Sequence, residues 1–477
     1  MVYTLSHQVE GTVPPQKAKV DKVIESAKTA LEKEDVSDSL KKSVGDVLDL
    51  VTALVNYVGL NSSNSSKPPS TDLHRPRKPR TARGRKRKPG AQKGHKGSQL
   101  KPVEKPDQIE EILVDRASLP KGRWRRIGFE KRQVFDVEVS FKVTEFQAEI
   151  LRSDTGIEFV ADFPTGVTQP AQYGDGVKAT SVYLSQHQLI PQARVRDALR
   201  TQFGLTVSDG SVNNFNILAA KKLEELGFEH WARTQLIASP LLHGDETGSN
   251  LKGELFWIHC LCNEKLTLFH FDKKRGKPAM DRMGVLPHFK GQLVHDHWKP
   301  YFRYVCTHIL CNAHHLRELE RAYEQDGQRW ARRMKKFLEE MNIAVTKAGG
   351  ELSDKKAEQC RKKYRKILRA AEKECPENTA QRAQTKSRNL LERLLAFEEE
   401  TLRFMEDSRV PFTNNQGERD LRMTKVQQKI SGCFRSALGA KNFCLIRSYL
   451  ATCRKNGIHP MEALRTIFAG KLPAFMS

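Results

Sequence analysis

The stretch Leu-Leu-His-Gly-Asp-Glu-Thr-Gly-Ser-Asn at residues 241–250 decides the fold of this chain. A short apolar run delivers one carboxylate, Asp245, to the end of an expected strand. The stretch Gln-Leu-Val-His-Asp-His at 292–297 repeats this plan with Asp296, and residues 298–301 are expected to turn into a helix. The sequence therefore predicts two strands that each carry an acidic residue to their end.

The segment between these two strands predicts how they pair within one sheet. Residues 254–262 alternate along the chain, and after a polar pair a second apolar run follows at 266–271, which is typical of a hairpin. Residues 278–288 have helical spacing, and 304–311 are a candidate fifth strand. If the fourth strand pairs in parallel beside the first, the two acidic residues lie side by side at one sheet edge. This is the layout of an α/β, ribonuclease-H-like mixed sheet.

Carboxylates that lie this close repel one another unless a hard cation sits between them, and Mg²⁺ prefers carboxylate oxygens, water and substrate phosphates. A two-metal site of this kind activates water or a 3′-hydroxyl for attack on a phosphodiester. The alternative is that Asp245 and Asp296 only cap loops at strand ends. Residues 410–422 supply a third acid, because Thr413 or Asn414 is a candidate N-cap with Glu418 and Asp420 in the early turns of a helix.

Four blocks of sequence then resemble the catalytic blocks of the insertion sequence 66 family of DDE transposases. They are His-Gly-Asp-Glu-Thr at 243–247, His-Asp-His-Trp-Lys-Pro-Tyr at 295–301, Cys-Asn-Ala-His-His-Leu-Arg-Glu-Leu at 311–319 and Asn-Asn-Gln-Gly-Glu-Arg-Asp-Leu-Arg at 414–422. The resemblance implies a catalytic and metal-binding triad of Asp245, Asp296 and Glu418, with Mg²⁺ or Mn²⁺ as cofactor.

The resemblance also implies a function, which is cleavage of transposon ends and strand transfer into target DNA. The basic side chains beside the third acid, Arg419, Arg422 and Lys425, are then expected to contact phosphates. The expected partners are transposon-end DNA and target DNA, and accessory proteins of the same element are further candidates. Two other classes stay open, a structure-specific DNA nuclease with the same fold and a catalytically inactive DNA-binding regulator.

Composition is compatible with this class of protein. The chain has 477 residues, 29% charged and 38% hydrophobic, and its net charge of +24 points to a polyanionic partner. No run of 18 apolar residues and no signal-peptide core is present, so we expect a cytoplasmic, nucleoid-associated bacterial protein without a membrane partner. All nine cysteines lie at or after Cys260, and we expect buried thiols rather than disulfides.

The N-terminal part predicts two segments. Residues 1–60 are expected to form a helical hairpin or short coiled coil, either as the element that makes a homo-oligomer or as a helix pair packed on its own protein. Residues 61–106 are expected to be a disordered basic linker that contacts DNA phosphates, the alternative being a solvated linker. From 67 to 105 it has fourteen lysines and arginines against two acids, a local balance of +12. The expected DNA-binding residues there are Arg75, Arg77, Lys78, Arg80, Arg83, Arg85, Lys86, Arg87, Lys88, Lys93 and Lys96.

Three further segments follow. Residues 107–170 are expected to form a small β-rich module with a strand at 133–144. Relatives in the resembled family carry a cysteine-rich zinc module at this place. This segment has no cysteine, so no zinc site is expected in the N-terminal half. Residues 171–232 read as a helix-turn-helix-like segment whose exposed face carries Asn213, Asn214 and Asn216, for DNA reading or as scaffolding. Residues 233–477 are the expected catalytic domain, with an all-helical insertion at about 316–405 that contacts DNA or another protomer.

Two histidine motifs lie near the predicted site. Cys311 and His314 have the spacing of half a metal site, but we favour a structural role in which they orient the active-site helix. His295 and His297 flank Asp296, and alternation places both on the opposite face. They are therefore not assigned as ligands.

Overall fold

The computed structural model describes residues 17–34, 36–65, 100–137, 141–377 and 384–476. The chain forms two compact units. The first comprises the described residues within 1–75, 165–197 and 207–477, and the second comprises those within 76–164 and 198–206. All three acids of the predicted triad belong to the first unit.

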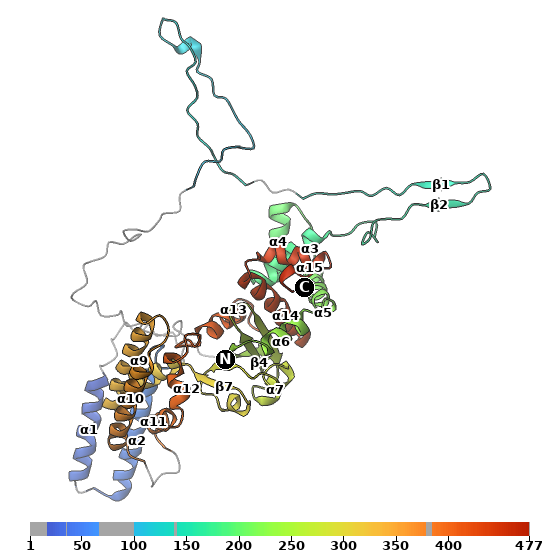
Figure 1. Cartoon of the computed structure of the whole chain (residues 1–477). Coiled ribbons are helices and arrows are strands. Elements are labelled where there is room, and N and C mark those ends of the chain that lie inside the picture. Colours follow the sequence, from blue (N-terminus) through green and yellow to red (C-terminus); the bar gives the residue numbers. More distant parts are fainter. Residues whose placement is uncertain (1–16, 35, 66–99, 138–140, 378–383, 477) are drawn as a thin grey trace, which may run out of the picture. The chain divides into compact units, whose positions relative to one another are not determined.

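A five-stranded mixed sheet forms the centre of the first unit, and two of its strands, β4 and β7, are labelled in Figure 1. Its strand order is β5-β4-β3-β6-β7. The strands are β3 Leu241–Leu251, β4 Glu254–Cys262, β5 Thr267–Asp272, β6 Gln292–His295 and β7 Thr307–Leu310. The first three are antiparallel, whereas β6 is parallel to both β3 and β7. Helix α7 (Lys277–Met283) precedes β6, and the 3-10 helix η4 (Lys299–Arg303) follows it. The predicted order and the ribonuclease-H-like sheet are confirmed.

Two C-terminal helices cover one face of this sheet, α13 (Asn415–Ser431) and α14 (Ala437–Lys455). Alternation along β4 places Ile258, Cys260 and Cys262 on the same face, where they share a core with Leu421 of α13 and Phe443 of α14. This packing brings α13 against β3 and β4. The helix that carries the third acid is therefore held directly over the strand that carries the first.

Helix α14 also protects the edge of the sheet. The backbone N–H groups of Thr267 and Phe269 on the edge strand β5 donate to the hydroxyls of Thr452 (3.1 Å) and Ser448 (2.8 Å). An edge strand with free N–H groups is a template for pairing with other chains. Side chains of α14 satisfy these groups instead, so β5 ends the sheet.

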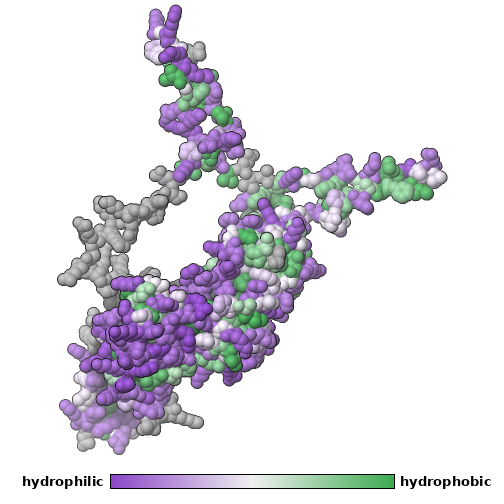
Figure 2. Space-filling model, in the orientation of Figure 1, coloured by the Kyte–Doolittle hydropathy of each residue, from purple (hydrophilic) through white to green (hydrophobic). Residues whose placement is uncertain are grey.

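The predicted all-helical insertion follows β7. It consists of α8 Asn312–Asp326, α9 Arg329–Lys347, α10 Asp354–Glu374, α11 Lys386–Ala396, α12 Glu398–Leu402 and the 3-10 helix η5 Arg403–Met405. Apolar side chains at helical spacing on α9, including Trp330, Met334 and Phe337, are buried in a core that continues to Val294 of β6 and Ile309 of β7. The insertion is therefore packed onto the sheet, while its outer face is mainly hydrophilic (Figure 2).

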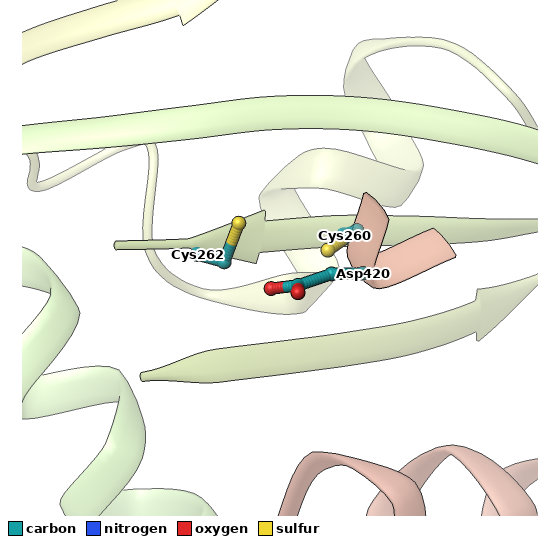
Figure 3. Close-up of side chains that lie close together, drawn as sticks. All are labelled: Cys260, Cys262 and Asp420. Atoms are coloured by element: carbon teal, nitrogen blue, oxygen red, sulfur yellow. The ribbon is translucent and has the colours of Figure 1, made fainter. Parts of the chain in front are cut away.

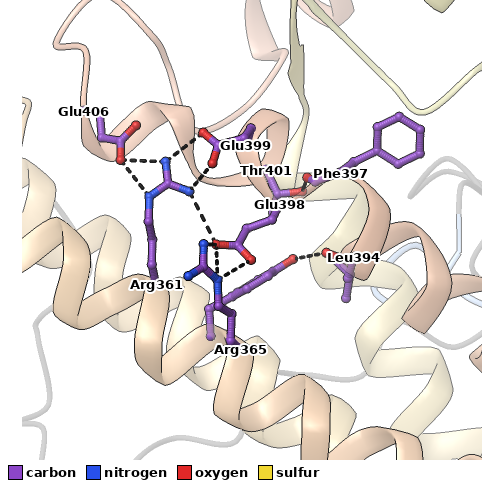
Figure 4. Close-up of polar contacts among 9 residues, drawn as sticks. Arg361, Arg365, Leu394, Phe397, Glu398, Glu399, Thr401 and Glu406 are labelled. Atoms are coloured by element: carbon purple, nitrogen blue, oxygen red, sulfur yellow. Dashed lines mark hydrogen bonds and ion pairs between the residues drawn. The ribbon is translucent and has the colours of Figure 1, made fainter.

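One buried arginine ties the insertion together (Figure 4). The guanidinium of Arg361 on α10 donates to carboxylates of Glu399 (2.7 Å) and Glu406 (2.6 Å) and lies 3.4 Å from Glu398. Its neighbour Arg365 pairs with Glu398 alone among the described residues. The side chain of Arg361 is 10% exposed and that of Arg365 is 46% exposed, so the guanidinium of Arg361 is the better shielded from water.

The N-terminal helices form the predicted hairpin, α1 (Lys17–Lys33) and α2 (Asp38–Val58). The hydroxyl of Ser37 accepts the N–H of Leu40 and caps α2, which has no fully buried residue. Beyond α2, the amide of Asn64 donates to Glu324 of α8 (2.9 Å). The basic linker residues 75–96 lie outside the described residues, as does most of that linker.

The helical segment before the sheet contains α3 Asp175–Val182, the π-helix η3 Tyr183–His187, α4 Gln192–Phe203, α5 Asp209–Glu225 and α6 Phe228–Ile237. The hydroxyl of Ser208 accepts the N–H of Ser211 and caps α5. One expectation for α5 is wrong. Asn216 is buried and accepts a hydrogen bond from Ser185 (2.8 Å), because α5 packs against α3, α14 and the C-terminal α15 (Pro460–Phe468). Asn213 and Asn214 are exposed as predicted.

The second unit contains the 3-10 helix η2 (Arg116–Ser118) and a short hairpin of β1 (Ile150–Arg152) and β2 (Glu158–Val160). The strand expected at 133–144 is not observed, because the described residues of that range pair with no neighbouring strand. Alternating side chains create a strand only where a partner accepts the backbone hydrogen bonds. The apolar side chains of this range, such as Val134 and Val143, are exposed.

Two composition-based expectations can be compared with the structure. All nine cysteines are free, and six of them are buried, which confirms buried thiols in place of a disulfide framework. None of the helices among the described residues is long and apolar enough to span a membrane. The last described segment is the 3-10 helix η6 (Ala474–Met476).

The Arg361 cluster yields a stability prediction. Replacing Arg361 by Ala is expected to lower the free energy of unfolding by about 3 kcal/mol, because it leaves partly buried carboxylates without their counter-charge. Replacing Arg365 by Ala is the matched control and is expected to cost less than about 1 kcal/mol, since that pair is solvated. Urea-denaturation midpoints measure both variants. Equal shifts would show that the shielding of Arg361 adds nothing.

Candidate active site

The first two acids are brought together by the parallel pairing of β3 and β6. In this register His243 is the partner of Val294. Asp245 and Asp296 each lie two residues further along, so they occupy corresponding positions where β6 has just ended. Adjacent strands are about 4.8 Å apart, so both residues lie side by side at the end of these two strands, on one edge of the sheet that runs across the strand ends.

The third acid reaches the same edge because Asn414 fastens the start of α13 to β3. Its side-chain amide donates to the carbonyl of Gly244 (2.8 Å), and its oxygen accepts from Nδ1 of His243 (2.8 Å). Its backbone N–H donates to Sγ of Cys311 (3.1 Å). Asn414 occupies the predicted N-cap position of α13, but its side chain caps no N–H of this helix. Its role is to join three segments.

A glycine permits the close approach of helix and strand. A Cβ added at Gly417 would lie 3.3 Å from Cβ of Asp245 and 3.2 Å from side-chain atoms of Asn414. Because there is no side chain at this position, the first turn of α13 lies against Asp245, and Glu418 follows immediately. A similar constraint applies on β3, where a Cβ at Gly244 would lie 3.2 Å from the ring of Tyr301.

The charge balance of this edge fits a bound cation. Burial raises the pKa of Asp245 well above its usual range, and the negative charges of Glu246, Asp296 and Glu418 raise it further. Burial likewise raises the pKa of Asp296 to about 6, with the charge of Glu246 as the next cause. Among the described residues neither carboxylate has a salt bridge. A divalent ion is the counter-charge that such a group of oxygen ligands would hold.

A fourth acid, Glu246, is neutralised by the protein itself. Its carboxylate pairs with Arg275 (2.8 Å) and accepts a hydrogen bond from Tyr301 (2.7 Å). The guanidinium of Arg275 lies over the rings of Trp257 (4.7 Å) and Trp298 (4.3 Å). The sequence did not predict this pairing of Glu246 with Arg275. The tryptophan beside Asp296 was a signal, but nothing in the sequence pairs it with an arginine from the loop after β5.

The predicted basic residues on α13 differ in their placement. Arg422 and Lys425 line a pocket of about 190 Å³ together with Asp245, Glu246, Thr247, Glu418 and Leu421. Nζ of Lys425 donates to the carbonyl of Gly248 (2.8 Å), which holds this cation beside β3. Arg419 is exposed and is not one of the lining residues. Arg317 of α8, which sequence reasoning missed, lies 3.7 Å from Oε1 of Glu418.

The other acid of α13, Asp420, faces the interior of the fold. It approaches the thiols of Cys260 and Cys262 on β4 (Figure 3). Its carboxylate pairs with Nζ of Lys455 (2.6 Å) and accepts from the hydroxyl of Thr267 (2.7 Å). Asp420 is therefore a structural anchor of α13 against β5 and α14.

Cys311 and His314 both lie beside the third acid. Cys311 precedes the first residue of α8, and its Sγ receives the N–H of Asn414, in line with a structural role. Ligand atoms of Cys311, His314 and Glu418 all lie within 4.8 Å of one another. His295 and His297 are oriented elsewhere, since His295 contacts His308 (3.0 Å) and His297 packs on Phe397.

Asp296 yields a prediction for stability without metal. Its pKa of about 6 exceeds the ordinary 3.8, so the folded state keeps a proton that the unfolded chain releases between about pH 4 and pH 6. Stability therefore falls as the pH rises through this window, by about 3 kcal/mol in total. Asp296→Asn is expected to raise the melting temperature in EDTA at pH 7. The control is Glu351→Gln on an exposed loop; a lower melting temperature for Asp296→Asn would contradict the burial argument.

Gly417 yields a prediction for the geometry. Gly417→Ala is expected to weaken Mg²⁺ binding about tenfold, because the added methyl group moves α13 away from Asp245 by a few tenths of an ångström. Alanine also favours the helix by about 1 kcal/mol, so the fold itself remains. Gly45→Ala on α2, where a Cβ meets nothing within 4 Å, is the control. Titration calorimetry with Mg²⁺ measures both, and unchanged affinity in Gly417→Ala would disprove the close-approach argument.

Comparison with known proteins gives few but specific matches. No curated protein matches the chain. A solved structure, the cryo-EM structure of a simian T-cell lymphotropic virus intasome in complex with PP2A regulatory subunit B56 gamma, is 12% identical. That match covers 44% of this chain and 74% of the other, with a TM-score of 0.14, and a likeness this low carries no argument.

Two family models match. Residues 13–101 match a family of unknown function, DUF6444. Residues 170–442, more than half of the chain, match the model described as Transposase IS66 family, and they contain the sheet, the insertion and all of α13. The chain therefore belongs to the IS66 family of transposases.

Proposed function

We propose that this protein is a DNA transposase that cleaves the ends of its own element and joins the freed 3′-hydroxyl to target DNA. Family membership implies DNA transposition and a phosphoryl-transfer enzyme with a divalent metal. The observation that supports the specific site is the convergence of Asp245, Asp296 and Glu418 from β3, β6 and α13 at one sheet edge. The first two of these carboxylates form no salt bridge among the described residues.

These three carboxylates would hold Mg²⁺ or Mn²⁺, because oxygen ligands with uncompensated charge suit a hard cation. When bound, such ions polarise the scissile phosphodiester and lower the pKa of the attacking hydroxyl. The protein's own contribution is to position the acids. Asn414 and Gly417 set the distance between α13 and β3, and Arg275 with Tyr301 removes Glu246 from the set of free acids.

Basic side chains would bind the DNA backbone beside the acids. Arg422 and Lys425 line the pocket, so a phosphate placed at the acids would lie within their reach. The basic linker, with its local balance of +12, would add sequence-independent affinity that falls with salt. The cytoplasm of a bacterium, in association with the nucleoid, is the compartment that suits this role. A homo-oligomer and accessory proteins of the same element would complete the assembly.

A decisive assay combines a linear fragment carrying the flanking DNA of the gene with a supercoiled target. The wild type is expected to cleave and join in Mg²⁺ or Mn²⁺ and to do neither in EDTA. Asp245→Asn, Asp296→Asn and Glu418→Gln are each expected to lower the cleavage rate at least about a hundredfold, since each removes a charged ligand. Glu351→Gln, a carboxylate change on an exposed loop, controls for a general effect of lost charge.

Other outcomes point to the two alternative functions. Cleavage without joining would favour a structure-specific nuclease. If the wild type and Asp296→Asn bind DNA alike and neither cleaves, a catalytically inactive DNA-binding regulator becomes the better account. Salt dependence of binding does not separate these cases, because phosphate contacts make all of them salt-sensitive.

A further inference from the structure

Beside the proposed triad lies a second group of ligands with a different chemistry. Sγ of Cys311, a ring nitrogen of His314 and a carboxylate oxygen of Glu418 lie within 4.8 Å of one another. The first two come from the start of α8 and the third from the first turn of α13. We propose that Cys311, His314 and Glu418 form a binding site for a zinc-class ion that takes Glu418 away from the catalytic site.

The residue types select the class of ion. A thiolate and an imidazole suit Zn²⁺, whereas Mg²⁺ takes oxygen ligands almost exclusively. In a tetrahedral zinc site with bonds of about 2.0 to 2.3 Å, ligand atoms lie about 3.5 Å apart. Because the three ligand atoms lie within 4.8 Å of one another, a contraction of at most about 1.3 Å is needed, which side-chain rotation can supply. Three protein ligands leave the fourth position for water.

Two features of the fold favour metal binding by His314 and Cys311. Nδ1 of His314 is buried and has no hydrogen-bond partner in the described part of the chain, although buried ring nitrogens are normally paired. Sγ of Cys311 receives the backbone N–H of Asn414 at 3.1 Å, which holds the sulfur in place, and because burial raises the pKa of this thiol, a thiolate there depends on the charge of a bound ion. The imidazole and the thiol are thus held in place by the fold, and the imidazole has an unused polar atom.

A similar cluster elsewhere does not meet these conditions. Cys260, Cys262 and Asp420 also lie close together (Figure 3), but Asp420 already pairs with Lys455 and Thr267. A metal ion there would have to displace a buried ammonium group at 2.6 Å. Beside Glu418 the cationic neighbour is Arg317 at 3.7 Å, a longer contact with a side chain that is 26% exposed.

Because Glu418 is shared, a zinc ion at this site would affect catalysis, an inference that rests on the proposed transposase function. Glu418 belongs both to the oxygen-ligand set with Asp245 and Asp296 and to the thiolate and imidazole set with Cys311 and His314. When its carboxylate turns toward the second set, the first set loses one ligand. Zinc is therefore expected to inhibit Mg²⁺-dependent cleavage by competing for Glu418.

Cobalt(II) is a direct probe, because it binds zinc sites and its spectrum reports a thiolate ligand. Metal-free wild type titrated with Co²⁺ is expected to show a thiolate-to-metal charge-transfer band and the visible bands of a four-coordinate ion, with one Co²⁺ per chain, and Zn²⁺ should bleach them. Cys311→Ser is expected to lose the charge-transfer band, and His314→Ala to weaken Co²⁺ binding at least tenfold. Cys433→Ser, at an exposed cysteine, and Asp245→Asn should keep the spectrum.

The spectrum and the cleavage assay test separate claims. No charge-transfer band in the wild type, or a band that survives in both Cys311→Ser and His314→Ala, would overturn the zinc site. If the band is present but no variant or wild type cleaves DNA, the zinc site stands and the transposase proposal fails. Where cleavage is present, Zn²⁺ should inhibit the wild type and Cys433→Ser, and should not inhibit the remaining activity of His314→Ala. Equal inhibition of His314→Ala would refute the competition for Glu418.

Discussion

The buried side chain of Asn414 is the contact on which the geometry of the site depends. It binds the backbone of β3 at Gly244 and the imidazole of His243, while its N–H binds Cys311 at the start of α8. The acids of β3 and β6 are placed by a local register, but Glu418 is more than a hundred residues away in sequence. Buried hydrogen bonds of this kind each contribute about 1 kcal/mol to the free energy of unfolding, and removing one partner costs more than that because the other is left unsatisfied. Their value here is positional, because they determine where α13 begins.

The charges around this contact are arranged unequally. Glu246 is fully engaged by Arg275 and Tyr301, whereas Asp245 and Asp296 are partly buried and form no salt bridge among the described residues. Without an ion the second pair destabilises the fold, since burial disfavours a charged carboxylate. The surrounding packing offsets this cost through the core beneath α13 and the core shared by the insertion and the sheet. Local instability at a site supported by a stable frame is common where function requires it.

The helical insertion is coupled to the site at both of its ends. Its first helix begins one residue after Cys311, and its last part, through the buried Val410, leads directly into the loop before Asn414. The N–H of Asn312 donates to the carbonyl of Phe412 (3.1 Å), which closes the insertion at its base. A shift of α8 against α13 would therefore change both the position of Glu418 and its distance from Cys311 and His314. The geometry of the insertion and the surroundings of Glu418 are therefore linked.

Local patterns in the sequence determined the strands, their order and the two acids at their ends, because alternation and spacing are properties of neighbouring residues. The same holds for the helical insertion. Only the tertiary structure decided which side chains meet across long separations. It buried Asn216 against Ser185 of η3, left the described residues of 133–144 without a strand partner, turned Asn414 toward β3 and paired Glu246 with Arg275. The physical reason is that burial, backbone pairing and charge compensation depend on contacts between distant segments, and a single sequence does not record those contacts.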